Sequence, residues 1–354
     1  MKVINAGFEH IVESSVTKKV ERVARVCYKS EDLITEGSDL KMMKMLVDRQ
    51  HYAMLEHASL VYVVSKEVYD KVKLLYDESK SVFSFGDGAE SFLSNIRMNF
   101  TSTDLCDGTV RYIVSANLRG WLEFFEYCVS TVAFSPINDG WLLIGLVESV
   151  SEQTKGIIDF TEYLNGVGTY TEDAVQLVTV FDRLTTPERI AHETMSVLFH
   201  VDRGVTHELV RMRDCSFAQE STRYCNYSQG KFGTEITVIK PCFWEEGSDA
   251  YDLWQLSCES AEQNYILLTE GLKEPAQRAR DVLPQSVKAD IVVTTNFQEW
   301  LHIFELRACD STGPAHPQMK EVMCPLCDSM TKEYPSIFGC LSYALSESMK
   351  KDIK

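Results

Sequence analysis

The sequence lacks several features that would place it in a familiar class of protein. No apolar run approaches the roughly 20 residues needed to span a bilayer, and Met1-Lys2-Val3-Ile4 begins no signal-peptide pattern. The G-x-G-x-x-G, Walker A, H-E-x-x-H and G-x-S-x-G signatures are also missing. We therefore expect a cytoplasmic protein whose chemistry differs from that of the common nucleotide-binding folds, zinc proteases and serine hydrolases.

Positive charge is in short supply as well. The 354 residues include 35 Lys and Arg against 52 Asp and Glu, so the formal net charge is -17 and the pI is near 5.0. Such a chain repels polyanions, so we expect neither a nucleic-acid polymer nor a membrane as a partner. A small anionic ligand held by a local group of arginines is compatible with this charge.

Lysine is absent between Lys155 and Lys231, so every fixed positive charge in that interval is a guanidinium. A guanidinium keeps its charge when it is partly buried and binds phosphate through two parallel hydrogen bonds. Residues 211–224 combine three arginines with two serines and an amide, a mixture suited to phosphate oxygens and the edge of a base. The alternative is that the arginines form surface ion pairs. The acids available for such pairs are Asp202, Glu208, Asp214 and Glu220.

Eleven cysteines in a chain with no secretion signal predict reduced thiols. One spacing, Cys324-Pro325-Leu326-Cys327, is compatible with half a zinc site or with a redox pair, but zinc needs a second pair of ligands. The extra candidates are irregularly spaced: Cys309, His316 and Cys340. We expect no metal, and we keep a thiol or zinc protein as a weaker alternative.

Apolar periodicity predicts a strand at Val3-Ile4, helices over residues 16–28 and 40–47, and a strand over residues 58–65. Residues 196–201 alternate like a strand. We expect Gly204 to break that strand and Thr206 to cap a short helix carrying residues 208–213.

Two further helices are expected in the C-terminal part. Residues 251–268 repeat at helical intervals, and Gly271 supplies a stop. The β-branched run of residues 289–295 predicts a strand that leads into a helix starting at Asn296. Glu299 follows three residues later, as in a capping box.

The texture of the sequence changes over residues 65–190, which we interpret as an insertion with its own structure. Within it, the segment from Asn117 to Glu126 lines up with the segment from Asn296 to Glu305, each after a β-branched run. One pair of matching segments falls short of a repeat array. The match nevertheless suggests that the insertion contains a degenerate copy of a strand-to-helix unit.

Taken together, the motifs resemble the flavin-dependent thymidylate synthases, whose signature is R-H-R, seven residues, then S, within a longer S-x-R-Y block. Here Arg211-Met212-Arg213 and, after seven residues, Ser221-Thr222-Arg223-Tyr224 match it. Further blocks follow the family's order: His51 with Leu55-Glu56-His57, Asp202 to Glu208, Arg280 to Pro284, and Asn296 to Arg307. The resemblance is to a long form of the family with an internal insertion.

The resemblance implies an α/β (α+β) fold in which a mixed sheet core is packed with helices, interrupted by an inserted α/β segment. It places the catalytic core at residues 1–64 and 191–345, the insertion at residues 65–190 and a tail at residues 346–354. It also implies a homotetramer whose active sites are shared between subunits.

Site residues are carried over motif by motif. The implied dUMP site comprises Glu208, Arg211, Gln219, Glu220, Ser221, Thr222, Arg223, Arg280 and Arg307. The implied FAD site comprises Ala53, Arg211, Met212, Arg213, Gln219, Asn296, Phe297, Gln298 and His302. His51 is expected near the folate and the flavin, and a carboxylate such as Glu220 so near a phosphate would need a partner of its own.

The resemblance also implies a mechanism. NADPH reduces FAD, methylenetetrahydrofolate donates the carbon, and the reduced flavin supplies the hydride that completes the methyl group of dTMP. Arg223 and Arg280 are expected to hold the phosphate. Arg307 is expected to favour the ionised N3 of uracil and so to make C5 nucleophilic, as the catalytic residue. No thiol needs to attack the base, so Cys215 and Cys225 are interpreted as packing residues.

The clear departure from the family is Met212, which stands where the signature has histidine. A thioether offers apolar, polarizable contact but no ring donor or acceptor. The alternative hypothesis is therefore a flavin- or nucleotide-binding homologue with impaired catalysis.

Overall fold

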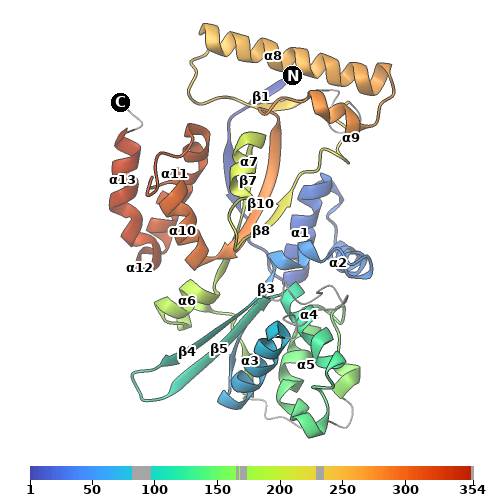
Figure 1. The fold of residues 1–354 in the computed structure, drawn as a ribbon, viewed down its shortest axis with the longest axis vertical. Helices are drawn as coiled ribbons and strands as arrows, with labels where there is room; N and C mark the ends of the chain where they lie inside the picture. Colours follow the sequence, from blue (N-terminus) through green and yellow to red (C-terminus); the bar gives the residue numbers. More distant parts are fainter. Residues whose placement is uncertain (82–96, 165–166, 168–173, 229–234, 352–354) are drawn as a thin grey trace. The chain divides into compact units, whose positions relative to one another are not determined.

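The computed structural model describes residues 1–81, 97–164, 167, 174–228 and 235–351. The chain forms two compact units (Figure 1). The first comprises Met1–Ile11, Val23–Asp32 and Met195–Lys354, and the second comprises Val12–Arg22 and Leu33–Thr194. Both units combine helices with a four-stranded sheet, which confirms a mixed α+β class.

The sheet of the first unit has the strand order β2-β7-β10-β8. β2 (Gly7–His10) pairs antiparallel with β7 (Thr194–Asp202), and β8 (Ser216–Gln219) pairs antiparallel with β10 (Lys288–Asn296). All seven residues between the ends of β10 are buried, as expected of an apolar, β-branched run covered on both faces. A separate parallel ladder joins β1 (Lys2–Ile4) to β9 (Thr237–Ile239).

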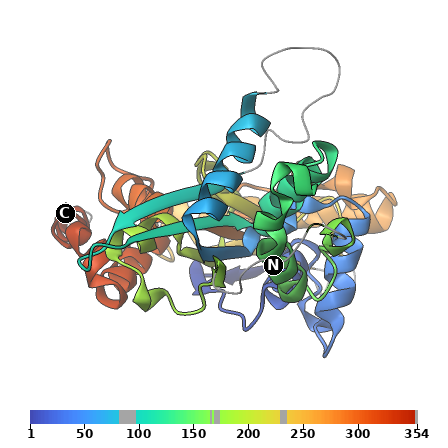
Figure 2. The same cartoon turned by 90° about the horizontal axis from the view of Figure 1, so that it is seen from below.

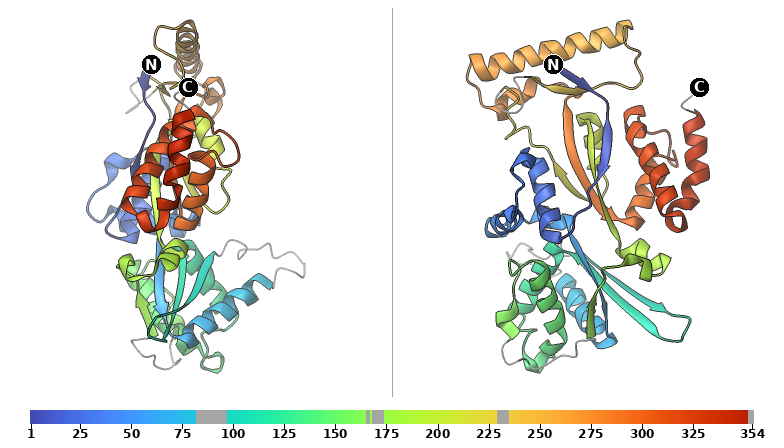
Figure 3. Two further views of the ribbon diagram at one scale, coloured as in Figure 1. Left: turned by 90° about the vertical axis from the view of Figure 1, so that its left-hand side faces the viewer. Right: turned by 180° about the vertical axis from the view of Figure 1, so that it is seen from behind.

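Helices surround these strands. They are α7 (Arg203–Leu209), α8 (Asp249–Ile266), α9 (Ala276–Ala279), α10 (Phe297–Arg307), α11 (Pro317–Glu333), α12 (Pro335–Phe338) and α13 (Ser342–Lys351). Shorter turns are a π segment at Leu267–Gly271 and 3-10 turns at Arg280–Val282 and Gly339–Leu341. α8 lies along the β1–β9 ladder (Figure 3) because its aromatic stripe, including Trp254 and Tyr265, packs around Val238.

The second unit has a sheet of order β4-β5-β3-β6, antiparallel throughout. Its strands are β3 (Ser59–Val64), β4 (Met98–Asp104), β5 (Val110–Asn117) and β6 (Val175–Leu177). Its helices are α2 (Ser38–Asp48), α3 (Lys66–Ser81), α4 (Leu118–Ser130), α5 (Ile144–Gln153) and α6 (Thr186–His192). The short turns are Tyr52–His57, Pro136–Asn138, Gly140–Leu143, Thr161–Leu164 and Phe181–Arg183. α1 (Val16–Tyr28) and the turn Glu31–Leu33 contribute residues to both units.

Alternate residues of β5 face different helices, as the period of a strand requires. On one face, Tyr69 of α3 packs its ring 5.1 Å from that of Tyr112. On the other face, the Ser115 hydroxyl lies 2.7 Å from Nδ1 of His192, the last residue of α6. Figure 2 shows α3 and α6 on opposite sides of this sheet.

Most of the expected elements are present at the expected places, including α1, α2, β3, α8, and β10 running into α10. The expectation for α7 was wrong. The helix begins at Arg203 because the Asp202 carboxylate accepts a hydrogen bond from the Val205 N–H at 2.7 Å, so Asp202 is the cap and Gly204 lies inside the first turn. The Thr206 hydroxyl instead donates to the Arg203 carbonyl at 3.0 Å.

The two compact units divide the chain differently from the expected domains. Residues 33–64 lie in the second unit together with the whole of residues 65–190, and residues 346–351 continue α13. Compactness and membership of a catalytic core are separate properties. The core at residues 1–64 and 191–345 therefore stays a prediction.

Candidate functional site

The first part of the signature, Arg211 to Arg213, lies in the loop between α7 and β8 of the first unit. α7 ends at Leu209, and the Met212 N–H donates to the Leu209 carbonyl at 3.0 Å, which closes the last turn. The Thr295 hydroxyl at the end of β10 donates to the Asp214 carbonyl at 2.7 Å. These bonds hold the loop beside the start of α10.

This loop and α10 enclose a hollow of about 460 Å³, here called the Arg307 pocket. It brings together four residues of the signature segment and four residues of α10, about ninety positions later, and five of these eight are predicted site residues. The lining residues are Arg211, Met212, Arg213, Asp214, Glu299, His302, Leu306 and Arg307.

Arg307 is the last residue of α10 and is only partly satisfied. One Nη lies 3.3 Å from a carboxylate oxygen of Glu208. The Nε atom is buried and has no hydrogen-bond partner among the described residues. A buried donor without a partner is unfavourable by about 1–3 kcal/mol, so an acceptor bound in the pocket would be stabilised here.

The other members of the pocket differ in exposure. Arg211, Arg213 and His302 are exposed, whereas Met212 is only 8% exposed. The thioether of Met212 therefore forms part of the apolar wall and supplies no hydrogen-bond donor.

A second hollow of about 250 Å³ in the same unit, here called the Arg280 pocket, is lined by Arg203, Thr222, Arg280, Asp281, Leu283, Pro284 and Gln285. Arg203 is a residue that the sequence did not single out, although it lies within the Asp202 to Glu208 block. Its N–H donates to the Gln285 carbonyl at 3.0 Å, which fixes the start of α7 against this loop. Arg223, expected here, is exposed and does not line the pocket; its guanidinium lies 5.3 Å from the ring centre of Tyr224.

The surface ion-pair alternative holds for Arg189, which binds Asp182 and Glu193, but it fails for Arg203 and Arg211. Arg203, Arg211 and Arg280 form no ion pair with any residue of the described part of the chain. Arg307 does pair with Glu208. Unpaired guanidinium groups at a pocket favour an anionic ligand.

Glu220 has the partners that a buried carboxylate requires. Its side chain is 1% exposed, and its Oε2 lies 2.9 Å from the Lys288 ammonium and 3.5 Å from the Lys29 ammonium. The Tyr227 hydroxyl donates to its Oε1 at 2.9 Å. Asp290 binds both lysines as well. Burial lowers the pKa of Lys288 to about 8, and the Glu220 carboxylate opposes that shift.

Three other predicted site residues have structural roles. The Gln219 amide donates to the Thr206 hydroxyl at 3.0 Å. The Ser221 N–H donates to the Cys27 carbonyl at 3.2 Å, which anchors the loop after β8. The Asn296 side chain accepts from the Glu299 N–H at 3.0 Å, as expected of the cap of α10.

The remaining predicted flavin residues lie in different surroundings. Phe297 is buried, and its ring packs 5.1 Å from that of Tyr334, so its side chain belongs to the core. Gln298 is exposed on α10. His51 and Ala53 are exposed in the second unit, at the start of the Tyr52–His57 turn. Their part in a site stays a prediction.

The cysteines show no site of their own. Cys215 and Cys225 are buried, in agreement with packing residues. Cys324 and Cys327 are buried in α11, and a hydrogen bond with Cys327 lowers the pKa of Cys309. Across the described ranges, no group of three or more His, Cys, Asp or Glu side chains is arranged to hold a metal ion.

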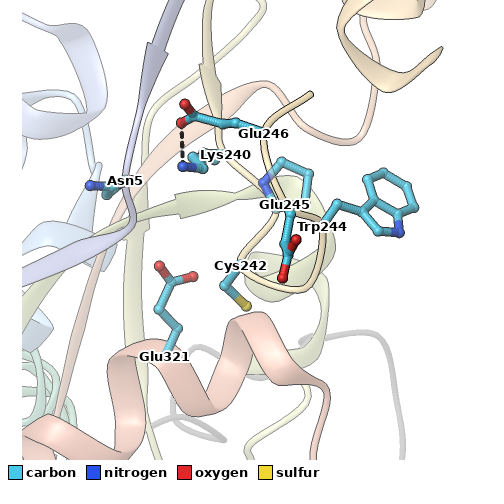
Figure 4. A pocket seen from close by; sticks show the side chains of 8 residues that line it. Asn5, Lys240, Cys242, Trp244, Glu245, Glu246 and Glu321 are labelled. Carbon is cyan, nitrogen blue, oxygen red and sulfur yellow. Dashed lines mark hydrogen bonds and ion pairs between the residues drawn. The ribbon is translucent and has the colours of Figure 1, made fainter. Parts of the chain in front are cut away.

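A third hollow of about 490 Å³ lies at the loop after β9 (Figure 4). Glu321 and Cys242 point towards it, and Lys240 forms an ion pair with Glu246 at its side. Its lining residues are Asn5, Lys240, Pro241, Cys242, Trp244, Glu245, Glu246 and Glu321. None of the residues carried over from the motifs lines this hollow.

Among the helices that the described residues form, none is long and apolar enough to cross a membrane.

Comparison with known proteins shows which family this part of the chain resembles. Residues 170–336 match the family described as thymidylate synthase complementing protein. This part of the chain is similar to the flavin-dependent thymidylate synthase of Pyrococcus abyssi, with 32% identity over 132 residues, 37% of this chain and 51% of that protein. It is also similar to the enzyme of that name from Geobacter sulfurreducens, with 31% identity over 110 residues, 31% of this chain and 45% of that protein. The resemblance to the flavin-dependent thymidylate synthases is therefore confirmed.

The chain spans about half the length of the curated relatives it matches. The matched region contains both arginine pockets and ends within three residues of the end of α11.

Proposed function

We propose that the protein is a flavin-dependent thymidylate synthase. It would convert dUMP to dTMP with methylenetetrahydrofolate as carbon donor and NADPH-reduced FAD as hydride source. The observation that carries the proposal is the Arg307 pocket, where the signature arginines meet a guanidinium whose buried Nε has no partner. In this proposal the core has the fold of that family.

The Arg280 pocket is suited to the phosphate of dUMP. Arg203 and Arg280 have no acidic partner among the described residues, and Thr222 adds a hydroxyl. Two guanidinium groups can bind a phosphate dianion through paired, charge-assisted hydrogen bonds. Arg223, Ser221 and Gln219 stay in the proposed dUMP site on the family's motif.

Arg307 is the proposed catalytic residue. A guanidinium placed at N3 of uracil stabilises the anion of the base, which places electron density on C5. Its bond to Glu208 fixes the orientation of the planar fork. The chain needs no thiol for this step.

The Arg307 pocket also suits the flavin cofactor. Arg211 and Arg213 supply positive charge for a pyrophosphate, Met212 supplies an apolar wall, and His302 supplies an exposed ring. Bound reduced FAD would supply the hydride that completes the methyl group. Gln298 and Asn296 stay in the proposed FAD site, together with Phe297, Gln219 and Ala53, and His51 is placed near the folate.

A second candidate function rests on Met212. Met212 stands where the signature has histidine, and its thioether donates no hydrogen bond to a flavin. In this alternative the protein binds flavin and nucleotide but turns over poorly. A homotetramer with shared sites and a cytoplasmic location complete the proposal.

One assay separates these possibilities. The purified full chain is supplied with FAD, NADPH, methylenetetrahydrofolate and dUMP, and dTMP is measured together with NADPH oxidation. We expect dUMP-dependent formation of dTMP that is lost in Arg307→Ala. Binding of FAD and dUMP without dTMP at any flavin concentration would support the impaired homologue, and absence of both kinds of binding would refute the family function.

A further inference from the structure

The sheets of the two units have the same plan. Written from the edge strand, the orders are β2-β7-β10-β8 in the first unit and β6-β3-β5-β4 in the second. In each unit the second strand is followed directly by a helix, α7 or α3. The third strand runs without a break into another helix, α10 or α4.

The junctions between the third strand and its helix match in atomic detail. Asn296 caps α10 by accepting a hydrogen bond from the N–H three residues later at 3.0 Å. Asn117 caps α4 in the same way at 2.8 Å. A capping Asn alone is common, so the match needs independent support.

That support comes from two buried tryptophans, each in the fourth position of its helix. Trp300 donates from Nε1 to the carbonyl of Met195 at 3.2 Å, and Trp121 donates to the carbonyl of Leu60 at 3.4 Å. Met195 and Leu60 are each the second residue of the neighbouring strand. The tryptophans therefore align β7 with β3 so that Ser196 corresponds to Val61.

The edge strands give the same alignment independently. The Ile11 N–H, just after β2, donates to the Ser196 carbonyl at 2.9 Å. The Val178 N–H, just after β6, donates to the Val61 carbonyl at 2.8 Å. A slip of one residue in either sheet would break this agreement. The corresponding pairs are Phe8↔Phe199, Glu9↔Leu198 and His10↔Val197, and Val175↔Val64, Gln176↔Val63 and Leu177↔Tyr62.

The edge strands are exchanged between the two halves of the chain. β2 comes early in the sequence but completes the sheet of β7, whereas β6 comes late and completes the sheet of β3. We propose that residues 7–130 and 175–307 are two copies of one framework, and that ligand chemistry survives only in the second copy.

The first copy has replaced the site residues. The alignment that matches Asn296 with Asn117 matches Arg307 with Cys128, His302 with Glu123, and Gln298 with Arg119. Cys128 is fully buried. Arg119 binds Glu123 and Glu56, each at 2.7 Å, so the counterparts of Gln298 and His302 are joined by an ion pair in the first copy.

The outer strands extend the same replacement to the phosphate residues. Ser115 pairs with Asn99 in one sheet, and the corresponding Thr294 pairs with Ser216 in the other. Continuing this alignment along the chain matches Ser221 with Asp104 and Arg223 with Cys106. The positions of Arg223 and Arg307 therefore both carry cysteine in the first copy, which removes two guanidinium groups from the counterpart of the site. The chain therefore holds one nucleotide site. The identity of its ligand as dUMP rests on the proposed function.

The test is a calorimetric titration of the full chain with dUMP, with Arg119→Lys and Arg280→Lys as matched variants in the two copies. We expect one dUMP per chain. Arg280→Lys should weaken binding about tenfold, because lysine cannot form the paired hydrogen bonds of a guanidinium. Arg119→Lys should leave both the stoichiometry and the affinity within about twofold of wild type, because it preserves the ion pairs.

Two dUMP per chain, or weakened binding in Arg119→Lys, would overturn the proposal. If the wild-type chain binds no dUMP, the proposed function fails, and the duplication is then decided by a crystal structure of the full chain. Edge-strand registers that differ by one residue between the two sheets would overturn the duplication itself.

Discussion

Glu220→Gln tests whether Glu220 holds the site or touches the substrate. The wild-type cluster balances two carboxylates, Glu220 and Asp290, against the ammonium groups of Lys29 and Lys288. Glutamine keeps the size and one acceptor for the Tyr227 hydroxyl but removes a negative charge. The variant therefore leaves an excess of buried positive charge.

The magnitude follows from the pKa of Lys288. Because that pKa is about 8, the folded wild type with Lys288 protonated is more stable at pH 7 than the folded wild type with Lys288 neutral, by about 1.4 kcal/mol. In the variant Lys288 can release its proton, so the stability lost at Lys288 does not exceed about this amount. The loss of the more distant Lys29 ion pair adds about 1 kcal/mol, the scale of a weak ion pair. We expect a loss of about 2 kcal/mol, below the 3–5 kcal/mol typical of breaking a buried pair.

Urea unfolding at pH 7, followed by circular dichroism, measures this loss. The control is Glu208→Gln, whose carboxylate is 34% exposed and should change stability by less than about 1 kcal/mol. At pH 9 the effect of Glu220→Gln should shrink, because Lys288 is then mostly neutral in the wild type. If Glu220→Gln keeps wild-type stability yet abolishes dUMP binding, the carboxylate contacts the nucleotide directly and the positioning role is refuted.

Three further predictions concern other elements. Arg307→Ala should reduce kcat at saturating dUMP at least about a hundredfold, the scale of removing one preorganised donor; equal kcat would contradict its catalytic role. His192 is buried, and burial lowers its pKa to about 4 from 6.5, so the unfolded chain alone binds this proton as the pH falls from 6.5 to 4. Stability should therefore fall over that window by about 3 kcal/mol more in wild type than in His192→Gln, as measured by urea unfolding at pH 7 and pH 4; parallel losses would show that His192 titrates normally. Met212→His should strengthen FAD binding severalfold in a fluorescence titration, because a ring donor or acceptor replaces a thioether; unchanged or weaker binding would remove Met212 as the reason for altered flavin affinity.

Local features of the sequence were sufficient to predict most elements. The periodic stripe of α8 and the β-branched run of β10 specify their elements through burial alone. The start of α7 was misjudged because two residues compete for the cap, and Asp202 wins by accepting from the Val205 N–H. The choice depends on where β7 ends, which is decided by its pairing in the sheet and not by the helix sequence.

The site was predictable to the extent that a motif names its residues. Arg211, Arg213, His302 and Arg307 line one pocket although α10 lies far along the chain. Arg203 was missed because its role depends on a loop around Arg280 that no local pattern places beside α7. The partners of Glu220 were not predictable, because the sequence does not show that Lys29 and Lys288 lie beside its Oε2. Its part in the dUMP site stays a prediction.

The internal match at Asn117 follows from the same distinction between packing and chemistry. Asn117 and Trp121 persist because a helix cap and a buried indole serve the framework whether or not a ligand is bound. The positions of Arg307 and Arg223 contribute little to the framework. The buried Nε of Arg307 has no partner among the described residues, which is unfavourable without a ligand, and Arg223 is exposed. They became Cys128 and Cys106 in the first copy. In such a repeat only residues that support the fold are kept. The sequence therefore reveals the repeat only at helix caps and large buried side chains. Its exchanged edge strands, which are short and variable in side chain, become recognisable only through their hydrogen-bond register.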